Sequence, residues 1–129
     1  MHHLALSVAD LTKSTEFYDA VLGPLGYRRI DTFESICVWG GQEPEVLLYP
    51  IESSDTSPHR KGRAGLQHLA VEVTDRQTVD DVHSAVITGG WTVVFPPMEY
   101  PDYAPGYYAV LVEDLDGSRW EFLHCPEQP

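Results

Sequence analysis

The stretch that decides the fold is His3-Leu4-Ala5-Leu6-Ser7-Val8-Ala9-Asp10, which returns as His68-Leu69-Ala70-Val71-Glu72-Val73-Thr74-Asp75. Similarity at a fixed spacing of this kind indicates two copies of one supersecondary unit. Each copy opens with a histidine at the same position. Two equivalent histidines that face each other across a pseudo-twofold axis are a natural start for a metal site.

The length and composition are typical of a single acidic domain. The chain has 129 residues, 20 acidic against 8 basic, and a formal net charge of −12. Its length suits a single domain with its own hydrophobic core. Nucleic acid and anionic membrane surfaces would be repelled, so neither is an expected partner. The charge serves solubility or attracts a cationic small molecule.

The sequence favours a cytoplasmic location. No apolar run approaches the roughly 18 residues that cross a bilayer, and the first residues do not resemble a signal peptide. Cys37 and Cys125 lie far apart and outside any metal-type spacing. We therefore expect two free thiols in a reducing compartment.

The first unit, residues 1–50, predicts a strand, a helix and three further strands. The helix begins after Asp10 or Thr12, which can cap it, and ends at Gly23-Pro24. Alternating apolar residues mark the strands, and Gly40-Gly41 marks a turn. The strands are expected at 3–8, 27–30, 35–39 and 45–49.

The second unit, residues 66–125, repeats this order after a polar linker at 51–65. Thr78 with Asp81 resembles a capping box, and the buried helix stripe is expected at Val79, Val82, Val86 and Ile87. The strands are expected at 67–73, 91–95, 107–113 and 119–124. The predicted fold is α+β, with two tandem βαβββ modules in one domain that curls around a cavity.

Strand alternation sorts the candidate ligands by face. If Leu4 and Leu69 pack under a helix, His3 and His68 lie on the opposite face of their sheets. The same argument on the last strand buries Trp120 and turns Glu121 to the histidine side. The predicted common concave face therefore carries His3, His68 and Glu121, and not His2, His83 or His124.

Three segments carry a resemblance to a known family: His3–Leu11 with Phe17-Tyr18 and Leu22-Gly23, Gly65–Val73, and Val112–Glu121. Together they resemble the vicinal oxygen chelate superfamily. This group includes glyoxalases, bleomycin-resistance proteins, fosfomycin-resistance enzymes and extradiol dioxygenases. Segments 20–27 and 105–109 are similar to a small, uncharacterised branch of it.

The resemblance implies a divalent metal ion in the cavity, held at His3, His68 and Glu121. A fourth family ligand position falls on Leu47 or Leu48, neither of which can bind a metal, and this argues against ordinary glyoxalase I chemistry. Two histidines and one carboxylate leave open positions for a chelating substrate and suit Fe, Mn, Ni, Zn or Co. The resemblance also implies a homodimer, with the cavity shared between chains.

Further residues are candidates for substrate contacts or catalysis. Glu72 is interpreted as a general base, a partner of a ligand, or a solvated carboxylate at the rim. Ser7 shares the cavity parity, and Arg119 would bind an anionic group of the substrate or pair with an acidic residue. Tyr103 and Tyr107 belong to segment 95–108, which is predicted to be a loop that covers the substrate or contacts a second chain.

Two functions fit these features. The first is a metal-dependent enzyme of the lyase, isomerase, transferase or oxygenase kind, in which the metal holds vicinal oxygens of a small substrate. The alternative is a metal-free protein that binds a drug or metabolite, as bleomycin-resistance proteins do. The acidic balance and the tyrosines suit a cationic aromatic ligand.

Overall fold

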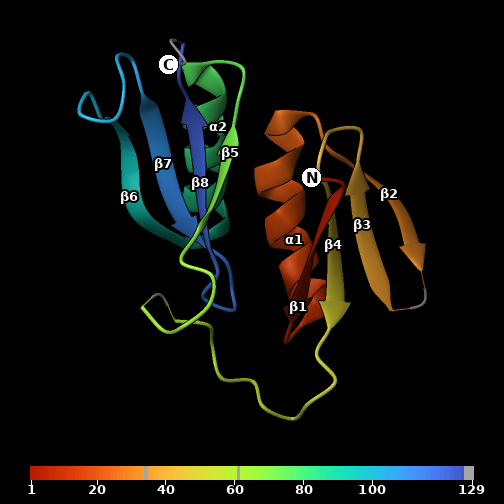
Figure 1. Ribbon diagram of the computed structural model, residues 1–129. Helices are drawn as coiled ribbons and strands as arrows, with labels where there is room; N and C mark the ends of the chain where they lie inside the picture. The colour runs from red at the N-terminus through yellow and green to blue at the C-terminus, as the bar shows by residue number, and fades with distance from the viewer. Residues whose placement is uncertain (34, 61, 127–129) are drawn as a thin grey trace.

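Two βαβββ units build the chain, as the sequence predicts. Figure 1 shows the computed structural model, which describes residues 1–33, 35–60 and 62–126. The elements are β1 (His3–Val8), α1 (Leu11–Leu22), the 3-10 turn η1 (Gly23–Leu25), β2 (Arg28–Phe33), β3 (Ile36–Gly40), β4 (Glu45–Pro50), β5 (Leu69–Glu72), α2 (Arg76–Gly89), β6 (Thr92–Glu99), β7 (Tyr108–Glu113) and β8 (Arg119–His124).

Each unit forms its own four-stranded sheet, with the orders β1-β4-β3-β2 and β5-β8-β7-β6. The first strand of each unit pairs in parallel with the last strand, and the other pairs are antiparallel. As a result, β1 and β5 are edge strands, each hydrogen-bonded on one side only within the described sheets. The alternation confirms the predicted pattern in β8, where Trp120 and Phe122 are buried and Glu121 is on the other face.

Aspartates cap both helices. The Asp10 carboxylate accepts a hydrogen bond from the backbone N–H of Lys13 at 3.0 Å, and the Asp75 carboxylate accepts one from Thr78 at 2.8 Å. The predicted capping box at Thr78 is therefore wrong, because the N-cap of α2 lies one turn earlier. The backbone N–H and the hydroxyl of Thr78 both donate to Asp75, and these two hydrogen bonds lower the pKa of Asp75 because they favour the charged carboxylate.

The helices pack between the two sheets and contact each other (Figure 1). Tyr18 of α1 shows why the units form one core: its ring lies 5.9 Å from Trp39 of β3 and 5.8 Å from Trp120 of β8. Its hydroxyl donates to the buried Asp114 carboxylate at 2.5 Å and accepts from the Trp120 indole at 3.1 Å. Each sheet therefore has one face on the shared core, and its other face points away from the helices.

Two local expectations are wrong. Ile87 is 58% exposed although the predicted stripe included it, because the buried face of α2 ends at Val86. Residues 95–99 belong to β6 and not to a loop, although Pro96 and Pro97 interrupt the residue pattern. Proline is tolerated there because β6 is an edge strand with register shifts against β7.

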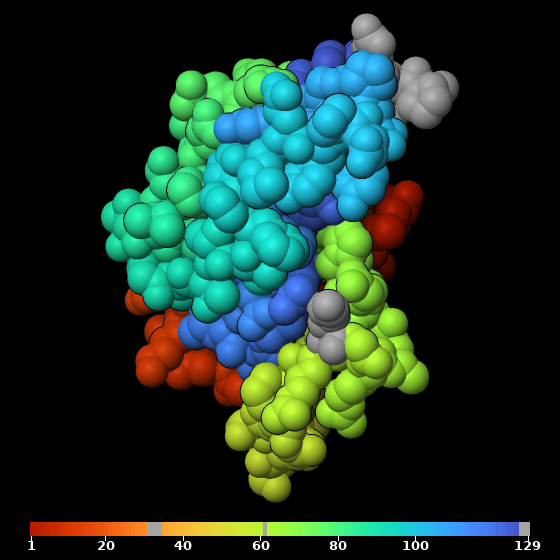
Figure 2. Space-filling model, turned by 90° about the vertical axis from the view of Figure 1, so that its left-hand side faces the viewer, coloured from red at the N-terminus to blue at the C-terminus, as the bar shows by residue number. Residues whose placement is uncertain are grey.

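The connection between the units runs along the lower part of the molecule (Figure 2, yellow to green). It contacts the first unit through the bond from the Ile51 N–H to the Val8 carbonyl, and the second through the bond from His59 to Asp116. Cys37 and Cys125 are present as thiols, as expected, and both are buried. In the part of the chain that the structure describes, no helix is long and apolar enough to span a membrane.

Candidate functional site

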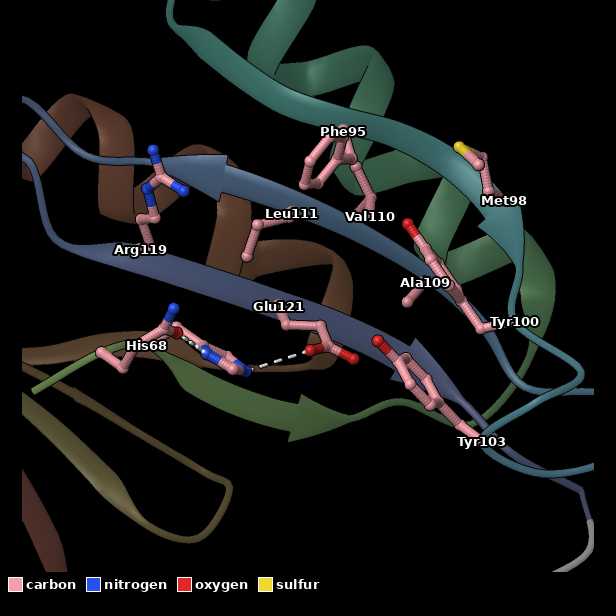
Figure 3. Close-up of a pocket in the computed structure, with 11 residues that line it drawn as sticks. His68, Phe95, Met98, Tyr100, Tyr103, Ala109, Val110, Leu111, Arg119 and Glu121 are labelled. Atoms are coloured by element: carbon pink, nitrogen blue, oxygen red, sulfur yellow. Dashed lines mark hydrogen bonds and ion pairs between the residues drawn. The ribbon is translucent and has the colours of Figure 1, made fainter. Parts of the chain in front are cut away.

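The His68 and Glu121 side chains meet on the outward face of the second sheet. The parallel register of β5 and β8 sets Ala70 beside Glu121, and His68 lies two residues before Ala70 on the same side. Its Nε2 is 3.2 Å from Glu121 Oε1, and the two side chains are 38% and 16% exposed. Figure 3 shows this pair on the wall of a pocket.

Each member of the pair is held by a neighbouring polar group. His68 Nδ1 contacts the Gln67 amide oxygen, which only accepts, so Nδ1 is the donor in this contact. His68 Nε2 faces Glu121 Oε1, and a metal ion bound between them would take the place of any proton on Nε2. The Tyr107 hydroxyl donates to Glu121 Oε2. Burial, followed by the Glu121 carboxylate, raises the pKa of Tyr107 well above its ordinary range, so the hydroxyl keeps its proton. Two donor atoms with such partners are arranged as metal ligands usually are.

The His3 side chain lies apart from this pair within one chain. It is on the first sheet, exposed, with its Nδ1 2.8 Å from Nδ1 of His2. Among the described residues, no three histidine, cysteine or acidic side chains are grouped closely enough to hold a metal ion. A single chain therefore brings together two of the three predicted ligands.

The register shows which residue of the first module corresponds to Glu121. Leu47 pairs with Ala5 in the first sheet, just as Glu121 pairs with Ala70 in the second. Leu47 is thus the counterpart of Glu121, whereas Leu48 is fully buried in the core. At this position the first module offers an apolar side chain and no donor atom.

A cavity of about 310 Å³ adjoins the His68–Glu121 pair. Arg119, one of the predicted substrate contacts, lies at one end, where its Nε donates to Glu113 at 3.1 Å. Tyr103 lies toward the other end (Figure 3). The lining residues are Gln67, His68, Phe95, Met98, Tyr100, Tyr103, Ala109, Val110, Leu111, Arg119 and Glu121.

Two other predicted site residues lie elsewhere in the chain. Glu72 lines a separate cavity of about 80 Å³. Ser7 lines a hollow against the linker, together with Asp55 and Arg63. In one chain, neither lines the pocket beside Glu121, so their predicted roles as catalytic and substrate-binding residues stay predictions.

Sequence reasoning missed the role of Gln67 and the bond from Tyr107 to Glu121. A signal for Tyr107 was present, because Leu111 faces Glu121 in the register of β7 and β8, and Tyr107 has the same parity as Leu111. Gln67 carried no such signal, since its contact depends on the side-chain conformation next to His68.

Comparison with known proteins agrees with this architecture. Residues 1–122 match the family model described as the Glyoxalase/Bleomycin resistance protein/Dioxygenase superfamily. The chain belongs to this superfamily.

Individual relatives resemble the chain along almost its whole length. The uncharacterized protein YqjT of Bacillus subtilis (strain 168) is 27% identical over 124 residues, 95% of this chain and 97% of that protein. The crystal structure of a glyoxalase/bleomycin resistance protein from Albidiferax ferrireducens T118 is 25% identical, with a TM-score of 0.78 and 98% of each chain covered. A lactoylglutathione lyase structure from Agrobacterium tumefaciens shares the fold, with 19% identity, a TM-score of 0.66, and 96% of this chain and 92% of that chain covered.

Proposed function

We propose that the protein is a divalent-metal-dependent enzyme that acts on a small substrate with chelating oxygens. The observation that carries this proposal is the His68–Glu121 pair: Nε2 and Oε1 are 3.2 Å apart, and Gln67 and Tyr107 hold the outer atoms of the two side chains. An imidazole nitrogen beside a carboxylate oxygen is a donor set that suits Fe, Mn, Co, Ni or Zn.

The third ligand in this proposal is His3 of a second copy of the chain. Within one chain His3 is on the other sheet, and the outer faces of the two sheets point away from the helices. Unpaired strand edges at β1 and β5 favour association with another chain. A twofold dimer that sets β1 of one copy along β5 of the other would bring His3 toward the His68–Glu121 pair and form two equivalent sites.

The chain's own residues would prepare the site for chemistry. When bound, the metal would supply Lewis acidity that stabilises negative charge on substrate oxygens. Glu121 and His68 would hold it, and Tyr107 would fix the orientation of the Glu121 carboxylate by donating to Oε2. Leu47 would leave one position without a protein ligand, where a substrate oxygen can bind.

Metal analysis tests the proposal. Protein purified without metal is incubated separately with Fe(II), Mn(II), Co(II), Ni(II) and Zn(II), desalted, and analysed for bound metal. We expect about one equivalent per chain with at least one of these ions, and loss of binding in His68→Ala and Glu121→Gln. His83→Gln, which alters a half-buried histidine on α2, is the matched control.

A second candidate is a metal-free protein that binds a small molecule. The exposed apolar side chains around the pocket favour it, because such clusters mark binding sites. Less than about one-tenth of an equivalent of every metal tested would favour this candidate and contradict the enzyme proposal.

A further inference from the structure

The cavity beside the His68–Glu121 pair is small, with a polar side and an aromatic side. Its volume of about 310 Å³ is at the lower end of the range for ligand sites, so it holds one small molecule. His68 and Glu121 lie together along one side (Figure 3). Tyr100, Tyr103 and the β6 residues line the other parts.

Several large apolar side chains at this cavity are open to solvent. Phe95 is 52% exposed, Met98 45% and Tyr103 70%. β6 and the following loop, residues 100–107, lie on the side of the molecule that faces the viewer in Figure 2. Exposed apolar groups that line one hollow indicate a surface that is covered when a ligand binds.

The tyrosines of this loop are held in place before any ligand arrives. Tyr100 and Tyr103 stack with their centroids 5.4 Å apart and their planes at 10°, and Tyr107 stands edge-on to both. Backbone bonds from Tyr100 to Tyr107 at 2.8 Å and from Tyr103 to Tyr100 at 3.0 Å close the loop. A surface held in this way loses little conformational entropy on binding.

The opposite wall and the floor suit a flat ring. Phe95 and Met98 of β6 face the cavity (Figure 3), and a methionine sulfur makes favourable contacts with aromatic rings. Ala109 on β7 is a small side chain at the floor. Aromatic walls favour an aromatic ligand over a saturated ring of the same size, because ring edges and faces attract each other.

We propose that this pocket selects a planar aromatic ring that carries a polar substituent, with the ring against Phe95, Met98 and Tyr103 and the substituent at the His68–Glu121 pair. The inference deepens the proposed function by naming the substrate class of the same site. Binding of the aromatic ring in this proposal requires no bound metal, since the residues that form the aromatic side of the pocket are in place in the single chain.

A matched pair of probes, phenol and cyclohexanol, tests the inference. Each is titrated into protein kept metal-free with a chelator, and the dissociation constant is measured by NMR. We expect phenol to bind about two- to tenfold more tightly than cyclohexanol. Equal affinities, or tighter binding of cyclohexanol, would overturn the inference.

Variants test whether the aromatic side chains of this pocket cause the preference for phenol over cyclohexanol. Tyr103→Leu and Phe95→Leu keep apolar bulk and remove a ring, and both side chains are exposed, so the fold should survive, as circular dichroism can verify. We expect the preference for phenol to disappear in the double variant and to persist in Ile87→Ala, which removes an exposed apolar side chain on α2. A preference unchanged in the double variant would overturn the assignment to this pocket. Absence of metal binding would contradict the proposed function and leave this result standing.

Discussion

The second module places Glu121 beside Ala70, whereas the first module places Leu47 beside Ala5 at the matching position of its sheet. The backbone pairing is the same in both modules, and the side chain that decides metal chemistry differs. The duplication has therefore preserved the scaffold and left the only carboxylate of the predicted ligand set on one copy. In this account the first module contributes His3 alone.

The two modules also differ in the length of the connection that follows their second strand. In the first module β2 ends at Phe33 and β3 begins at Ile36, whereas in the second module residues 100–107 separate β6 from β7. This longer connection carries the tyrosine that bonds to Glu121 and the two that stack. The extra length thus supplies both the support for the carboxylate and the aromatic wall of the pocket.

The largest expected effect comes from making the second module resemble the first. Glu121→Leu removes the carboxylate, and we expect metal affinity to fall by more than about 100-fold. Measurement of the metal dissociation constant checks this, with Glu52→Gln in the linker as a control for lost charge. Unchanged affinity in Glu121→Leu would mean that the difference between Glu121 and Leu47 is irrelevant to metal binding.

A smaller loss of metal affinity is expected in Tyr107→Phe. The ring and its contacts remain, but Glu121 Oε2 loses its hydrogen-bond donor. We expect metal affinity to fall by about 10- to 100-fold, as for other partners of metal ligands, with the fold unchanged. Tyr103→Phe makes the same chemical change in the same cluster and should bind metal as the wild type does. Equal affinities in the two variants would refute a positioning role for Tyr107.

Tyr18→Phe tests the connection between the modules instead of their difference. The variant leaves the buried Asp114 carboxylate and the Trp120 indole without the hydroxyl that joins them. We expect the free energy of unfolding to drop by about 1–3 kcal/mol. Urea denaturation measures the loss, and Tyr49→Phe on the outer part of β4 should change it little. A wild-type midpoint in Tyr18→Phe would show that the network does not stabilise the packing of the two modules.

The smallest effect concerns pH. Burial raises the pKa of Asp114 above that of an unfolded aspartate, although hydrogen bonds from Tyr18 and the backbone oppose the shift. The folded state therefore holds the proton more tightly, and this contribution to stability is complete below the unfolded pKa and lost as pH rises through the folded pKa. The stability of the wild type relative to Asp114→Asn should decline as pH rises from about 4 through this window. A constant difference would contradict the raised pKa.

Sequence reasoning predicted the fold, and it put two of the three candidate ligands on one face of a sheet, because strand alternation has a period of two. That period turns Trp120 into the core and Glu121 out of it, and it puts His68 on the same side as Glu121. It cannot state how two modules pack against each other. The separation of His3 from the pair depends on the contact between α1 and α2, which no local pattern encodes.

Other features were beyond sequence reasoning for local physical reasons. Proline normally ends a strand, so Pro96 and Pro97 concealed the continuation of β6 along a free edge. Ile87 follows the last buried residue of α2, Val86, and is exposed although it was expected in the buried stripe. The contact of Gln67 with His68 arises from side-chain geometry that sequence spacing does not specify.

One measurement tests the central claim that each site combines both modules from different chains. A His3→Ala chain and a Glu121→Gln chain are coexpressed with different C-terminal tags that lack histidine, and the mixed dimer is isolated through both tags. In a shared-site dimer, one of its two sites keeps His3, His68 and Glu121, and the other loses two ligands. We predict about half an equivalent of metal per chain in the mixed dimer and almost none in either variant alone. Metal binding in the mixed dimer no higher than in the separate variants would contradict the claim.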